Sequence, residues 1–169
     1  MTEMQTIDSK ANFQQAMSLF AAGVTVITAM HDAKPVGLIA TSVCSLSDDP
    51  PSVIVCVNKC ASSHDAILGA GSFAVNLLST AHCGLVDTFR KFKGKDRFAG
   101  NKWSSLATGA PILPDATVAL DCEISDRHDG FTHSIIVGVI REIAFNETVD
   151  AGCLLWHERG FARSAPLSI

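Results

Sequence analysis

The stretch that decides the fold is VGLIATSVCSLSDDPPSVIVCVN, residues 36–58. Residues 36–43 and 52–57 are apolar enough to form two core strands. Between them, residues 41–51 carry hydroxyls, a thiol, two acids and two prolines, and Asp49-Pro50-Pro51 disfavours helix because a residue before proline prefers extended geometry. Such hydroxyls, with free backbone N–H groups at a strand end, suit a planar polar ligand or a phosphate. The alternative is an ordinary long hairpin loop with Ser and Asp as turn formers.

The rest of the chain alternates strand patterns with short helical ones. Phe13, Met17 and Phe20 form one stripe of an amphipathic helix over residues 11–20, and the β-branched residues 24–28 predict a strand. Further strands are expected at 72–78, 117–128, 133–145 and 152–161, helices at 61–71 (capped by Ser62 or Ser63) and 80–92 (capped by Thr80), and an irregular link at 94–114. Seven strands joined mostly by short links predict a mainly β fold, an antiparallel Greek-key barrel with a few flanking helices.

Length and composition favour one globular domain. The chain has 169 residues, 47% hydrophobic and 18% charged, which is enough to bury a core without disulfides. A net charge of −4 argues against a nucleic-acid partner, although the basic cluster at 89–98 can attract one small phosphorylated ligand. We expect no membrane span and no secretory signal, and therefore a cytoplasmic protein whose six cysteines are reduced core thiols.

Residues 58–63 predict an anion site. A strand ends at Asn58, and Ser62 and Ser63 then open a helix whose first N–H groups are unpaired, while Lys59 adds positive charge. Ordinary N-capping by one serine is the alternative. The spacing of Cys56, Cys60 and His64 invites a metal site, but a strand-then-helix path separates the three side chains, so we predict no metal.

Two further segments carry histidines. In DGFTHS, residues 129–134, His133 enters a long strand after a glycine turn and is a candidate for the mouth of a cavity; a histidine hydrogen-bonded at a strand end is the alternative. The segment WHERGF, residues 156–161, is either a lid over a ligand or a dimer edge. There is no GxSxG motif and no serine with an evident His/Asp pairing, which excludes a hydrolase triad, and GxGxxG and Walker patterns are absent.

Taken in order, several segments resemble the short-chain flavin reductase family, the reductase components of two-component flavin-dependent monooxygenases of the 4-hydroxyphenylacetate monooxygenase type. These segments are FQQAMSLFAAGVTVITA, GLIATSVCSLSDDPPSVIVCVNKCASS, FAVNLLS, DRFAG, GAPIL, ALDCEISD and THSIIVGVI. The likeness covers roughly residues 12–161 and implies a split β-barrel over 11–163, between an N-terminal arm (1–10) and a C-terminal tail (164–169). It also implies a homodimer that binds FMN or FAD, takes NADH or NADPH as co-substrate and supplies diffusible reduced flavin to a monooxygenase.

The resemblance also assigns roles to particular residues. It implies that His133 and Thr132 face the nicotinamide, where the family has a Gly-Asp-His or Gly-Thr-His motif that reads Phe131-Thr132-His133 here. The cofactor contacts it implies are Ala40, Thr41, Ser42, Val43, Cys44, Ser45, Val57, Asn58, Lys59, Ser62, Ser63 and Phe89, together with Arg159 and Phe161, which it places toward the nicotinamide dinucleotide.

Two departures from the family pattern leave alternatives open. Phe131 replaces a glycine, and Ala162 stands where a terminal histidine is expected. A flavin-binding or storage module without turnover therefore remains an alternative, as does a flavin-dependent reductase of another large cofactor such as a corrin.

Overall fold

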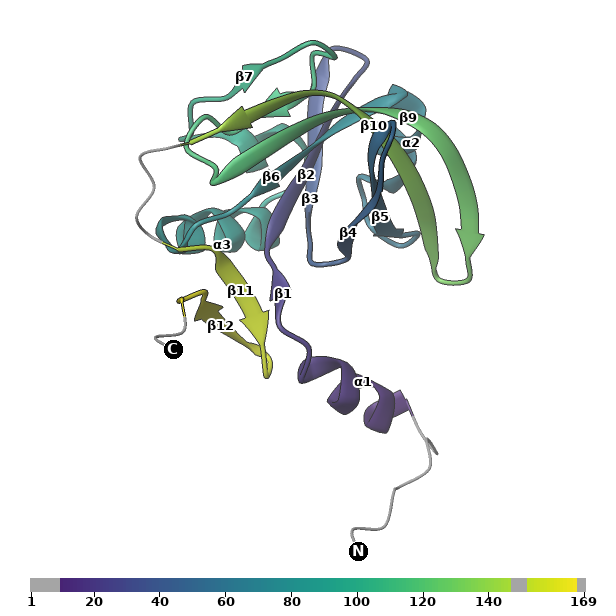
Figure 1. Ribbon diagram of the computed structural model, residues 1–169. Helices are drawn as coiled ribbons and strands as arrows, with labels where there is room; N and C mark the ends of the chain where they lie inside the picture. Colours follow the sequence, from purple (N-terminus) through teal and green to yellow (C-terminus); the bar gives the residue numbers. More distant parts are fainter. Residues whose placement is uncertain (1–9, 147–151, 167–169) are drawn as a thin grey trace, which may run out of the picture.

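The computed structural model describes residues 10–146 and 152–166, and its main feature is a seven-stranded sheet in the order β3-β2-β6-β9-β10-β5-β4 (Figure 1). Every neighbouring pair is antiparallel. The strands are β2 (Thr25–His31), β3 (Lys34–Ala40), β4 (Val43–Asp48), β5 (Pro51–Asn58), β6 (Ser72–Leu77), β9 (Val118–Gly130) and β10 (His133–Phe145). Although β3 and β4 are consecutive in the chain, they lie at opposite ends of this order, so the sheet curls into a barrel that is split between them.

The remaining elements flank this sheet. A second sheet has the order β1-β11-β12 and a third contains β7 and β8. Their bounds are β1 (Ala22–Gly23), β7 (Ser104–Ser105), β8 (Pro111–Ile112), β11 (Leu154–His157) and β12 (Gly160–Arg163). The helices are α1 (Lys10–Ser18), α2 (His64–Ala70), η1 (Thr80–His82), α3 (Cys83–Lys91) and η2 (Gly94–Phe98). No helix in the described ranges is long and apolar enough to cross a membrane.

Three apolar clusters of buried residues form the core, and the first two are the larger. The first fills the barrel, where Ile27, Phe73 and Ile136 pack with Ile67 of α2. Gly138 permits this packing, because a Cβ there would lie 2.5 Å from the Phe73 ring. The second cluster lies between the sheet, α3 and β11 and includes Phe89.

Buried polar side chains hold the segment between α3 and β9 against the sheet. The Asn76 amide donates to the carbonyl of Val26 at 3.2 Å and accepts from the backbone N–H of Leu113 at 2.8 Å. Asp121, fully buried, accepts from the Thr108 N–H at 2.7 Å and from its hydroxyl. Because buried polar groups must be paired, these hydrogen bonds fix the position of this segment on the sheet.

The mainly β prediction is confirmed, and the two long strands agree within two residues at each end. The strand predicted over 36–43 is confirmed as far as Ala40 and wrong beyond it, since the chain leaves the sheet there and re-enters it as β4 at Val43. The strand predicted over 152–161 is a hairpin of two strands. The helix predicted over 80–92 is capped by Ser79 and not by Thr80. The side chains of Ser79 and His82 form a capping box.

The predicted terminal segments need correction at their inner ends. Lys10, placed in the arm, is the first residue of α1. Ser164, placed in the tail, donates its N–H to the Cys153 carbonyl and accepts the Cys153 N–H through its hydroxyl. Residues 1–9 and 167–169 lie outside the described residues. The cysteines are all free, but only Cys122 is buried, so the expectation of six core thiols is wrong for the exposed Cys44 and Cys60.

Candidate functional site

The corner between β3 and β4 presents Thr41 and Ser42, both exposed. It is fixed to the neighbouring strand by two hydrogen bonds: the Ser42 hydroxyl donates to the Cys56 carbonyl at 2.8 Å, and the Cys56 N–H donates to the Ser42 carbonyl at 3.1 Å. The Thr41 hydroxyl forms no hydrogen bond with any described residue. This corner is therefore rigid while keeping one hydroxyl available.

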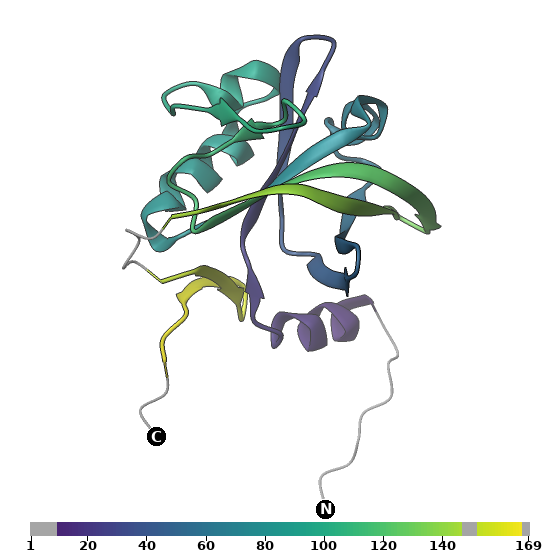
Figure 2. The ribbon, with the colours of Figure 1, turned by 45° about the horizontal axis from the view of Figure 1, so that its top comes forward.

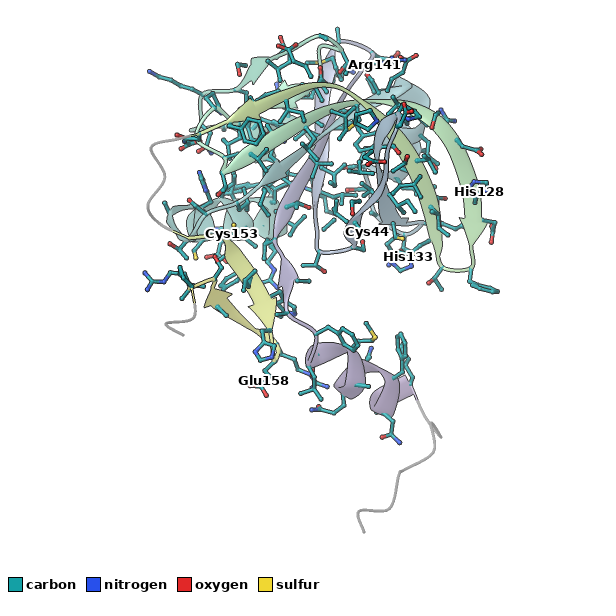
Figure 3. All side chains as sticks on the ribbon, in the orientation of Figure 1. Cys44, His128, His133, Arg141, Cys153 and Glu158 are labelled. Carbon is teal, nitrogen blue, oxygen red and sulfur yellow. The ribbon has the colours of Figure 1, made fainter. Side chains whose placement is uncertain are left out.

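Residues 43–48 form the edge strand β4, where an open polar stretch was expected. Cys44 and Ser45 are exposed and Val43 is half-buried. Because β4 ends the sheet order, one of its edges has no strand partner within the described residues, and its outward N–H and C=O groups are available to a ligand. In the view of Figure 3, Cys44 of β4 and His133 of β10 both lie toward the inner side of the curved β9–β10 hairpin.

The turn after β5 is built by Asn58, whose side-chain oxygen accepts the N–H of Cys60 at 2.8 Å. This is an Asx-type turn, which explains why asparagine suits a strand end here. Lys59 is tied to the tip of the β9–β10 hairpin: its N–H donates to the Thr132 carbonyl at 3.0 Å, and its ammonium pairs with Asp129. The hydrogen bond from Lys59 lowers the pKa of the Asp129 carboxyl.

His133 lies at the start of β10, opposite Asn58 of β5. Its Nδ1 lies 2.9 Å from the Thr132 hydroxyl, and within the described residues its Nε2 has no hydrogen bond. The ring is half-buried. The structure thus brings His133, Thr132, Asn58 and Lys59 together, and it leaves one imidazole nitrogen for a ligand.

Arg97, which the sequence did not single out, completes the predicted anion site. Its guanidinium donates to the Gly37 carbonyl at 2.7 Å and to the Ser63 hydroxyl at 3.2 Å, while the Ser63 hydroxyl also donates to Gly37 at 2.8 Å. Arg97 has no carboxylate partner within the described residues, and burial lowers its pKa. Ser62 is exposed beside this pair. A half-buried, unpaired cation next to two serines is suited to an anion.

Ser63 is the N-cap residue of α2, but its side chain makes no capping hydrogen bond. Ordinary N-capping therefore does not explain the second serine of the pair. The signal for Arg97 was the basic cluster at 89–98, but the contact with Gly37 spans 60 positions, which no local pattern predicts.

The C-terminal hairpin and α1 border an open cavity of about 390 Å³. Its lining includes Thr41, Ser42, Trp156 and Arg159, together with Phe13 and Met17 of α1. Arg159 donates to the side chain of Gln15 of α1 at 3.3 Å. Phe161 does not line this cavity; it packs edge-on against Trp156 with ring centroids 5.4 Å apart.

Three predicted contact residues point into the core. Ala40 and Val57 are buried in the barrel cluster, so only their backbone groups can meet a ligand. Phe89 is buried against Phe98 and Trp103, and it reaches the site only through its ring, which lies 5.9 Å below the guanidinium of Arg97. A buried side chain in this position supports Arg97 and does not touch a ligand.

A Ser–His–Asp chain is present after all, at the base of α2. Nε2 of His64 lies 2.9 Å from the Ser134 hydroxyl, and Nδ1 lies 2.7 Å from the Asp65 carboxylate. Asp65 is fully exposed, so water competes for it. The prediction that no serine has such a pairing is therefore wrong. These hydrogen-bonded side chains connect α2 to β10, the strand that carries His133. No group of three or more metal-ligating side chains occurs in residues 10–146 and 152–166.

Comparison with known proteins places the chain in a family. Residues 17–165 match the flavin reductase like domain. An FMN reductase (NADH), RutF 2, of Methylorubrum extorquens is 39% identical over 154 residues, which cover 90% of this chain and 88% of that protein.

Solved structures agree. The NADH:FAD oxidoreductase SgcE6 of Streptomyces globisporus superposes with a TM-score of 0.89 at 27% identity, covering 99% of each chain, and it has also been solved in complex with NAD and FAD fragments. BorF, the flavin reductase component of a bacterial two-component tryptophan halogenase, gives 0.82 at 30% identity, covering 92% of this chain and 98% of that one.

Proposed function

Because the chain belongs to the flavin reductase-like domain family, it is an NADH-dependent flavin reductase, and we propose that its reaction takes place between the outer edge of β4 and His133. FMN or FAD supplies the ring nitrogen, N5, that accepts hydride from C4 of the nicotinamide when the two rings stack. One observation carries this assignment: groups suited to both ligands lie around the turn after β5. On the α2 side of the turn, Arg97 lies beside Ser63 without a carboxylate partner in the described residues. On the β5 side, His133 lies opposite Asn58.

The phosphate of the flavin binds at Ser62, Ser63 and Arg97. Ser62 has an exposed hydroxyl, and the described residues leave Nη2 of Arg97 without a hydrogen bond. A guanidinium presents donors in a fixed fork that matches phosphate oxygens. Ser63 and Arg97 are already held by Gly37, so they are in place before the ligand arrives.

The flavin ring lies along the corner and outer edge of β4. The side chains of Thr41, Ser42, Cys44 and Ser45 are small, so a flat tricyclic ring meets no bulk there. Outward N–H groups of the edge strand would donate to the pyrimidine end of the bound ring, where they would stabilise the negative charge of the reduced flavin.

His133 positions the nicotinamide. When the Thr132 hydroxyl donates to Nδ1, the proton of a neutral imidazole lies on Nε2, which then donates to the carboxamide oxygen. No strong acid or base is needed, because the transferred group is a hydride. This role accounts for a half-buried histidine with one satisfied nitrogen and one unsatisfied nitrogen.

The apolar face of α1 supports a homodimer. None of its residues is buried, and Phe13 and Met17, with Phe20 just beyond, are 55%, 47% and 66% exposed. In Figure 1 the helix projects beyond the barrel at the end that carries β1, and Figure 2 shows it from a second direction. A second copy covering this stripe would remove the three side chains from water, and Phe20→Asp should then shift the protein to a monomer in sedimentation velocity.

We infer that reduced flavin leaves this protein for a separate oxygenase in the cytoplasm. BorF serves as such a component for a halogenase. The contacts assigned above are hydroxyl, backbone and guanidinium groups without a covalent link, which permits release.

The decisive experiment mixes purified protein with NADH and free FMN and follows the loss of nicotinamide absorbance. His133→Ala should lower kcat/KM for NADH about tenfold, the value of one hydrogen bond, and leave the KM for FMN unchanged. His128→Ala, a 57% exposed histidine on the same hairpin, is the matched control and should behave like the parent protein. Flavin binding without NADH oxidation would refute the proposal and favour a storage module.

A further inference from the structure

Phe131 combines two unfavourable features. It is 92% exposed, more than any other large apolar side chain in the described part of the chain. Its φ of 61° lies in the left-handed region, which strains any residue with a Cβ and which glycine tolerates freely. A bulky residue kept in a strained and solvated position points to a function, because neither packing nor local geometry favours it there.

The hairpin tip that carries Phe131 is held firmly. Its N–H donates to the Asp129 carboxylate at 2.9 Å, and Asp129 is paired with Lys59. On the other side of the turn, the Lys59 N–H donates to the Thr132 carbonyl at 3.0 Å. The aromatic ring is therefore displayed by an anchored tip and not by a loose loop.

The ring is within reach of the dinucleotide. Phe131 precedes His133 by two positions, so their Cα atoms are at most about 7.6 Å apart. A nicotinamide bound at His133 would leave the rest of the dinucleotide free to extend toward this tip. Its second aromatic ring, adenine, would then be the part able to meet Phe131.

We propose that Phe131 stacks on the adenine ring of NADH and so serves as a binding residue for the distal half of the dinucleotide. The inference rests on the proposed function, which places the nicotinamide at His133. Adenine offers a flat π-face, and base–aromatic stacking contributes to affinity wherever it occurs. Stacking would cover much of the exposed ring, which offsets the strain of the turn.

Steady-state kinetics with two hydride donors tests this. NADH carries adenine, whereas reduced nicotinamide mononucleotide has the same nicotinamide and lacks adenosine. Phe131→Leu keeps the Cβ and the backbone strain and removes the aromatic face. It should raise the KM for NADH about five- to tenfold, leave the KM for the mononucleotide and for FMN unchanged, and leave kcat unchanged. Phe131→Trp should restore the KM for NADH.

Other outcomes overturn the inference. Equal losses with both donors would place Phe131 against the nicotinamide or give it a purely structural role. An unchanged KM for NADH would show that the ring touches no part of the dinucleotide, and a change in sedimentation coefficient would assign it to an interface between copies. Failure of the proposed function itself looks different, since the parent protein would then oxidise neither donor.

Discussion

Replacing Arg97 by glutamine should distinguish the contribution of the flavin phosphate to binding from the contribution of the ring. In the structure this guanidinium has no carboxylate partner within the described residues, lies beside Ser63, and has Nη2 donors that no described residue uses. A hydrogen bond to a charged group contributes about 1.5–3 kcal/mol. Losing one such contact with a phosphate should therefore raise the Kd for FMN about 10- to 150-fold.

Riboflavin is the internal control, because it has the same ring and no phosphate. Its Kd should not change on Arg97→Gln, and titration followed by flavin fluorescence measures both ligands in one format. Arg90→Gln removes the same charge from α3, where the side chain lies over Trp156, and should leave FMN binding intact. Arg97→Lys should give an intermediate Kd, because an ammonium keeps the charge but not the fork.

The substitution also has a structural cost that must be measured. Arg97 donates to the carbonyls of Gly37 and Phe92, and losing these two bonds should lower the free energy of unfolding by about 2 kcal/mol. Binding is therefore compared at a temperature where urea unfolding shows every variant fully folded. If FMN and riboflavin weaken equally, or if neither weakens, the phosphate does not bind at Arg97.

Three further changes test other parts of the structure. Gly138→Ala places a methyl group 2.5 Å from the Phe73 ring and should destabilise the protein by about 1–3 kcal/mol in urea unfolding; an unchanged midpoint would mean that the core has room there. Phe131→Gly relieves a left-handed residue and should raise the free energy of unfolding by about 1 kcal/mol, visible as a higher Tm, whereas a lower Tm would show that the ring is part of the packing. The hydrogen bond from Lys59 lowers the pKa of Asp129 from its ordinary value of 3.8. The pairing therefore stabilises the folded protein at pH values above 3.8, and this stabilisation is lost as the pH falls through the pKa of the folded state. The difference in Tm between the parent protein and Asp129→Asn should accordingly be present at pH 7 and shrink below pH 3.8, and a difference that persisted at pH 2 would contradict this account.

The sequence predicted best where burial imposes a regular pattern. Strands β9 and β10 were predicted within two residues because their apolar positions recur along long uninterrupted segments. Strand β4 escaped because five of its six residues are exposed, so it has no buried face to generate an alternation. The break between β11 and β12 was missed because Glu158 and Arg159 both adopt positive φ without the residue types that usually signal such a turn.

The candidate site could be predicted only as separate pieces. The segments 41–45, 58–63 and 131–133 each carry local signals: small polar residues, a helix start and a histidine in a turn. The contacts of Arg97 with Gly37 and of His64 with Ser134 depend on tertiary packing, which joins positions 60 and 70 residues apart. Propensity and spacing describe neighbours along the chain and cannot show which distant side chains meet.

The Gly37 carbonyl, on the strand at one side of the split, is held by the two side chains assigned to the phosphate. Under the proposed assignment, Ser63 and Arg97 would both hold this side of the split in place and bind the phosphate of the flavin. The phosphate would then compete with the Gly37 carbonyl for the hydrogen bonds of these two side chains. Binding of flavin would therefore be coupled to the contacts that keep the barrel closed.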